Sequence, residues 1–85
     1  MNVTHHPKRR AQLEAQLAQR QEECARIDAM FDPATMPPAT RSLIEREAAR
    51  RGIAFDQLRP MLHLDLYVDA ARRLAEVERD LAAFD

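Results

Sequence analysis

Apolar residues recur at helical spacing near the start of the chain, and no proline or glycine interrupts them after Pro7. They are separated by 4, 7, 3 and 4 residues: Leu13, Leu17, Cys24, Ile27 and Phe31. This spacing gathers the side chains into a heptad-like stripe on one face of a helix. Pro7 suits a first helical turn, where its missing N–H has no intrahelical partner to lose. We therefore predict a helix over 7–31, preceded by a flexible tail over 1–6.

A second apolar stripe runs to the end of the chain at alternating spacings of 3 and 4 residues: Tyr67, Ala70, Leu74, Val77, Leu81 and Phe84. Asp56 is a good N-cap residue, and Pro60 is tolerated early in a helix, so we predict a helix over 56–84. The two long helices would span ~37 and ~43 Å at ~1.5 Å per residue. Because these lengths match, we expect antiparallel packing along the two stripes.

Three prolines lie directly after the first helix, in the segment 32–38. Each proline disfavours helical conformation in the residue before it, so this segment predicts a loop. A short helix should begin between Pro38 and Ser42 and cover about 40–52, and Ser42 followed by Glu45 matches a capping box near its start. Gly52 suits the left-handed position that ends many helices. The expected fold is therefore all-α: a long helical hairpin with one short helix beside or across it.

The segment 62–68 carries a second periodicity, because every other residue from Leu62 to Val68 is apolar. A strand would explain this pattern, but no second strand is available to pair with it. We prefer a helix that is apolar on two faces, with one face left for a second copy or another protein. The residues predicted to form that dimer or partner interface are Met61, Leu62, Leu66, Tyr67, Ala70 and Leu74.

Chain length and cysteine content limit how this domain can be stabilised. A chain of 85 residues forms one domain at most, here expected over 7–85, with a marginal core of its own. Cys24 is the single cysteine, so no internal disulfide can form. No zinc-like spacing of cysteine and histidine occurs, and we expect no metal and no cofactor. Additional stability would then come from oligomerisation or a partner, and a homodimer is the favoured expectation.

Net charge and hydropathy argue against a nucleic-acid-binding protein and against a membrane or secreted protein. The net charge is -1, without the basic excess typical of nucleic-acid binders, so nucleic acid is an unfavoured partner. No apolar run is long enough to span a membrane, and no apolar stretch follows the basic residues near the N-terminus as in a secretory signal. We expect a cytoplasmic protein with no membrane partner.

No catalytic residues are predicted. His63 and Asp65 are two positions apart and point in different directions on a helix. Cys24 falls on an apolar stripe, where a cysteine usually acts as a small buried apolar group. His5 and His6 are adjacent, which makes a weak chelate. We therefore predict a non-enzymatic interaction module, such as an adaptor, a small chaperone or a regulatory subunit.

The alternative is a small DNA-binding regulator. The segment 42–62 has the spacing of a helix-turn-helix around Gly52. Its arginines would contact phosphates: Arg46, Arg50, Arg51 and Arg59. Pro60 and the leucines after it weaken this alternative, because a recognition helix needs polar side chains that read bases. The same segment resembles the two helices of ribbon-helix-helix antitoxins, but the prolines before it preclude the strand that this fold needs, so no family is assigned.

Overall fold

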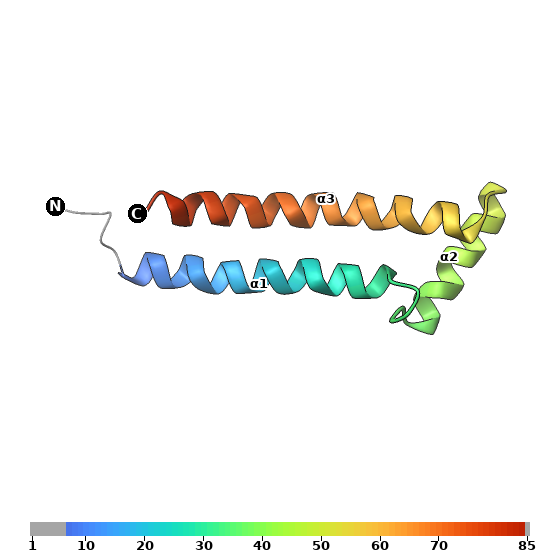
Figure 1. Ribbon diagram of the computed structural model, residues 1–85, viewed down its shortest axis with the longest axis horizontal. Helices are drawn as coiled ribbons and strands as arrows, with labels where there is room; N and C mark the ends of the chain where they lie inside the picture. Colours follow the sequence, from blue (N-terminus) through green and yellow to red (C-terminus); the bar gives the residue numbers. More distant parts are fainter. Residues whose placement is uncertain (1–6, 85) are drawn as a thin grey trace.

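The computed structural model describes residues 7–84 and contains three helices in that range: α1 (Pro7–Phe31), α2 (Pro38–Arg51) and α3 (Phe55–Ala82). Helices α1 and α3 lie side by side and antiparallel, and α2 crosses one end of the pair (Figure 1). The molecule is a rod of 61 × 19 × 15 Å. The prediction of an all-α hairpin with a short third helix is confirmed. The predicted tail over 1–6, with His5 and His6, lies outside the described residues.

Helix α1 has the predicted bounds, and the loop after it is held by its own polar groups. The Asp32 carboxylate accepts a hydrogen bond from the Ala34 N–H at 2.9 Å, and the Asp32 carbonyl accepts one from the Met36 N–H at 2.8 Å. The Thr35 hydroxyl donates to the carbonyl of Ala29, which the end of α1 leaves without a helical partner, at 2.6 Å. The chain therefore turns within six residues and positions α2 across the end of α1 (Figure 1).

Helix α2 begins at Pro38, within the predicted range, but its first turn is not formed by the predicted capping box. Pro37 is the extended N-cap residue and Pro38 is the first helical residue, so Ser42 lies inside the helix. The expected role of Ser42 and Glu45 at the helix start was therefore wrong. Proline at the first position already has a helical φ and has no N–H to satisfy, so it begins the helix without a side-chain cap.

Gly52 ends α2 in the way that the sequence predicted. Its φ of 72° is left-handed, and the N–H of Ile53 donates back to the carbonyl of Ala48 at 3.0 Å. Helix α3 then begins at Phe55, so Asp56 lies in its first turn and is not the N-cap as predicted. The N-cap is Ala54, whose N–H donates to the side chain of Gln57 at 2.9 Å. Asp56 still lies favourably near the positive end of the helix dipole.

Pro60 lies inside α3, deeper in the helix than expected because α3 begins before Asp56. It has no N–H to donate to the carbonyl of Asp56, so the early part of α3 gains less from backbone bonding than the rest. The helix nevertheless continues without a break through 62–68, so the alternative of a strand in this segment was wrong. The period-two pattern marks a helix that is apolar on more than one side.

The core has two parts. At the closed end, where three helices meet, Phe31, Ile44, Ala48 and Leu58 form one buried cluster, with partly buried side chains around it. Arg41 lies over the ring of Phe55, with 4.9 Å from guanidinium carbon to ring centroid. Along the rod only α1 and α3 face each other, and the buried residues there are Leu13, Cys24, Ala70 and Val77. The shaft is thus a two-helix seam, which leaves the opposite face of each long helix uncovered.

Candidate interaction surface

The uncovered face of α3 carries a row of apolar side chains. Met61 is 52% exposed, Leu64 61% and Val68 53%. Ala71, which is half-buried, and Ala75, which is exposed, continue the row, so that successive spacings are 3, 4, 3 and 4 residues. At about 3.6 residues per turn this spacing keeps all five on one side of the helix. We call these five residues the back stripe: Met61, Leu64, Val68, Ala71 and Ala75.

The back stripe lies opposite the seam with α1. Met61 is nine residues before the buried Ala70, and Val68 is nine residues before the buried Val77. Nine residues correspond to two and a half helical turns, or roughly 180° around the axis. Because α1 occupies the side of Ala70 and Val77, it leaves Met61, Leu64 and Val68 about half exposed or more. An exposed apolar row of this kind marks a contact surface more often than isolated apolar residues do.

The residues predicted for the interface do not form one surface. Met61 belongs to the back stripe and is exposed, whereas Ala70 is fully buried in the seam and is inaccessible to a partner. Leu62 is half-buried and packs against the closed-end cluster. Leu74 and Tyr67 are also half-buried. Of the six predicted residues, only Met61 and Leu66 present large exposed apolar side chains.

Leu66 is 49% exposed, but it faces a different direction from the back stripe. It is seven residues after Arg59 and seven before Arg73, and a separation of seven residues returns to the same face of a helix. Arg59 donates to the carbonyl of Phe31 at 3.1 Å, and Arg73 donates to the carboxylate of Glu23 at 3.2 Å. Leu66 therefore lies on the flank that α1 approaches, not on the open back of α3.

A shallow groove lies on the other flank, between α1 and α3. Its lining residues are Asp28, Pro60, His63, Leu64 and Tyr67. The imidazole of His63 stacks on the ring of Phe31, with 5.5 Å between centroids, and its Nε2 is 2.8 Å from the carboxylate of Asp28. His63 thus connects α3 to α1 and does not pair with Asp65. The groove borders the back stripe at Leu64.

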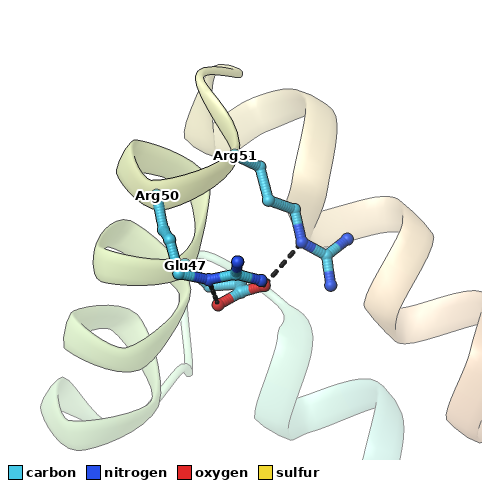
Figure 2. Close-up of polar contacts among 3 residues, drawn as sticks. All are labelled: Glu47, Arg50 and Arg51. Carbon is cyan, nitrogen blue, oxygen red and sulfur yellow. Dashed lines mark hydrogen bonds and ion pairs between the residues drawn. The ribbon is translucent and has the colours of Figure 1, made fainter.

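Most of the arginines proposed to contact DNA form hydrogen bonds with other residues of this chain. Figure 2 shows Arg50 and Arg51 converging on the single carboxylate of Glu47, where Arg50 Nε donates at 2.9 Å and Arg51 also donates. Arg59 is half-buried and bonded to the end of α1. Arg46 is exposed on α2. Three of the four arginines, Arg50, Arg51 and Arg59, therefore have hydrogen-bond partners within the chain.

The same cluster lowers the pKa of Glu47 from 4.5 to about 2, first because of the hydrogen bond from Arg50 and then because of that from Arg51. The pKa of Arg50 is raised by the same hydrogen bond. Both arginine side chains are exposed and Glu47 is partly so, which means that the ion pairs order the last turn of α2 and contribute little to stability. Glu47 is charged throughout the physiological range.

Among the described residues, His63 and Asp28 form a histidine–carboxylate contact at 2.8 Å between α3 and α1. Cys24 is a free, buried thiol in the seam. Within residues 7–84 no group of three or more histidine, cysteine, aspartate or glutamate side chains is arranged to hold a metal ion. No helix in that range is both long and apolar enough to cross a membrane.

Comparison with known proteins gave no match: no protein-family model fits the chain, and neither a curated protein nor a solved structure is detectably similar to it. The candidate surface therefore depends on the geometry of this chain alone. Sequence reasoning had identified the apolar character of 62–68 but missed Leu64, Val68, Ala71 and Ala75 as one row. Their 3-4-3-4 spacing from Met61 was visible in the sequence and could have found them.

Proposed function

We propose that this protein is a non-enzymatic interaction module that binds another protein chain through the back stripe of α3. The observation that carries the proposal is the exposure of Met61, Leu64 and Val68, each more than half accessible, in one row on the face of α3 opposite α1. A partner helix laid along this row would bury all three, as in helix-in-groove and bundle-completion modes of binding.

The shape of the molecule supports a scaffold of this kind. A rod with α2 at one end presents the back stripe along a straight, uninterrupted helix (Figure 1). The seam with α1 and the contacts of Arg59, His63 and Arg73 hold α3 in place, so a partner meets a helix that is already ordered. Binding to an ordered surface avoids the entropy that a disordered segment must lose.

A paired set of variants tests this function. Leu64→Glu places a charge within the back stripe, at a side chain that is 61% exposed. Leu43→Glu places the same charge at a leucine of α2 that is 60% exposed. We expect both variants to fold, because both side chains are exposed. With each variant as bait in an extract of the source cells, Leu64→Glu should lose the proteins bound by the wild type, and Leu43→Glu should keep them.

Equal binding by both variants would contradict the proposal. If duplex DNA bound the wild type with a strong salt dependence, and the arginine variants Arg46→Ala and Arg50→Ala removed that binding, the DNA-binding alternative would replace it.

A further inference from the structure

We infer that the back stripe binds a second copy of itself, so that two α3 helices pack antiparallel about a two-fold axis beside Val68. This inference depends on the proposed function and names the partner. It is based on two patterns along the stripe, one of size and one of charge, and both are complementary to themselves only when the second copy runs in the opposite direction.

The size pattern divides the stripe into a large half and a small half. Met61 and Leu64 precede Val68, whereas Ala71 and Ala75 come after it. With the two-fold axis beside Val68, Met61 of one copy lies opposite Ala75 of the other, and Leu64 lies opposite Ala71. Large side chains opposite small ones let the two helices approach closely and leave no gap. A parallel pair would place large against large at one end and small against small at the other.

The charge pattern has the same symmetry. Asp65 directly follows Leu64 and Arg72 directly follows Ala71, so the two residues are seven apart and lie on one edge of the stripe. Both are exposed, and the midpoint between them falls beside Val68. In a two-fold contact, where residue i meets j and j meets i, Asp65 of each copy therefore faces Arg72 of the other. Two ion pairs form across the antiparallel contact.

Arg72 bonds to Asp69 on its own helix, at 3.1 Å, with both side chains mostly exposed. A guanidinium group has donors on both its terminal nitrogens, so Arg72 can add a contact to a second carboxylate without losing the first. The stripe from Met61 to Ala75 spans only ~21 Å, which makes the contact modest in area and the dimer dependent on protein concentration.

Charge reversal in two separate variants tests the arrangement. Asp65→Arg places a new guanidinium group against Arg72 at both symmetric positions, and Arg72→Asp places a new carboxylate against Asp65 at both. Light scattering coupled to size-exclusion chromatography, over a concentration series, should show a dimer for the wild type. Each variant alone should dimerise at least about tenfold more weakly, as expected when two attractive contacts become repulsive.

The two variants mixed in equal amounts should associate again with about the affinity of the wild type. In the mixed dimer the introduced arginine of one chain faces the introduced aspartate of the other. The original Arg72 of the first chain faces the original Asp65 of the second, so both contacts are attractive.

The matched control is the pair Glu22→Arg and Arg26→Asp on α1, where the two residues form an exposed ion pair at 3.2 Å. These control variants change the net charge by the same amounts as the test variants. They should dimerise as the wild type does, both alone and mixed.

A wild type that stays monomeric at its highest soluble concentration would overturn the inference, as would variants that dimerise normally or a mixture that remains monomeric. These failures are distinguishable from failure of the proposed function. If the wild type is monomeric but Leu64→Glu loses its bound proteins and Leu43→Glu keeps them, the proposed function stands and the partner is a different protein. If both variants capture the same proteins and the wild type forms no dimer, the proposed function and the inferred dimer are both wrong.

Discussion

The two sides of α3 have similar patterns and opposite environments. The seam side has apolar residues at spacings of 3 and 4, and Ala70 and Val77 on it are buried against α1. The back stripe has the same spacing, yet Met61, Leu64 and Val68 are all more than half exposed. Periodicity thus shows how many apolar faces a helix has, but it does not show which of them the fold covers. Three pairs of variants measure this difference, at a dilution where the chain is monomeric.

The largest contrast is between two leucines of α3, Leu58 and Leu64. Leu58 is fully buried in the closed-end cluster, whereas Leu64 is 61% exposed. Leu58→Ala removes buried methyl groups and leaves a cavity, so we expect it to lower the free energy of unfolding by about 2–5 kcal/mol. Leu64→Ala should change it by no more than about 0.5 kcal/mol. Urea unfolding followed by circular dichroism measures both, and similar losses would show that the back stripe is covered within the chain.

A smaller contrast comes from enlarging an alanine on each side. Ala70 is fully buried in the seam, whereas Ala75 is exposed on the back stripe. Ala70→Leu should destabilise the fold by about 1–3 kcal/mol, because extra methylenes have no room. Ala75→Leu should leave the stability almost unchanged, because leucine is also a good helix former. Thermal melts of the two variants give the comparison, and tolerance of leucine at position 70 would argue for a looser seam.

The smallest contrast concerns two neighbouring arginines. Arg73 reaches across the seam to Glu23 at 3.2 Å, and Arg72 bonds to Asp69 on its own helix at 3.1 Å. The Arg73 pair is the less exposed of the two, with side chains 38% and 33% accessible against 67% and 58%. We expect Arg73→Ala to cost up to about 1 kcal/mol and Arg72→Ala about 0.3 kcal/mol or less. Urea titrations at low and high salt measure the free energy of unfolding of both variants. An equal loss of this free energy in the two variants would mean that the Arg73 contact does not stabilise the hairpin.

Helix boundaries could be predicted where one local feature dominates. Pro7 and Gly52 each mark a helix end for a reason within their own backbone, and the structure confirms both. Predictions failed where two local features competed. We predicted that Ser42 caps α2, but the N-cap residue is Pro37. We predicted that Asp56 caps α3, but the N-cap residue is Ala54. Several caps were chemically reasonable in each case, and in both the helix begins before the predicted cap residue.

The candidate surface could be predicted only in part. The sequence places an excess of apolar residues between Met61 and Val68, which implies more than one apolar face. It does not show that Leu62 packs against the closed-end cluster while Leu64 faces outward, because both are leucines in the same helix. That distinction depends on the direction from which α1 and α2 approach α3.

By itself, the sequence determined three helices, the loop between the first two and the antiparallel pairing of the long pair, because proline, glycine and apolar spacing act over a few neighbouring residues. Only the tertiary structure decided which apolar residues are buried. A hairpin of two helices supplies one covering surface for each helix, and α2 is long enough to cover only the closed end. The face of α3 opposite α1 is therefore left open, and the position of α1 selects Met61, Leu64 and Val68 as the residues that it exposes.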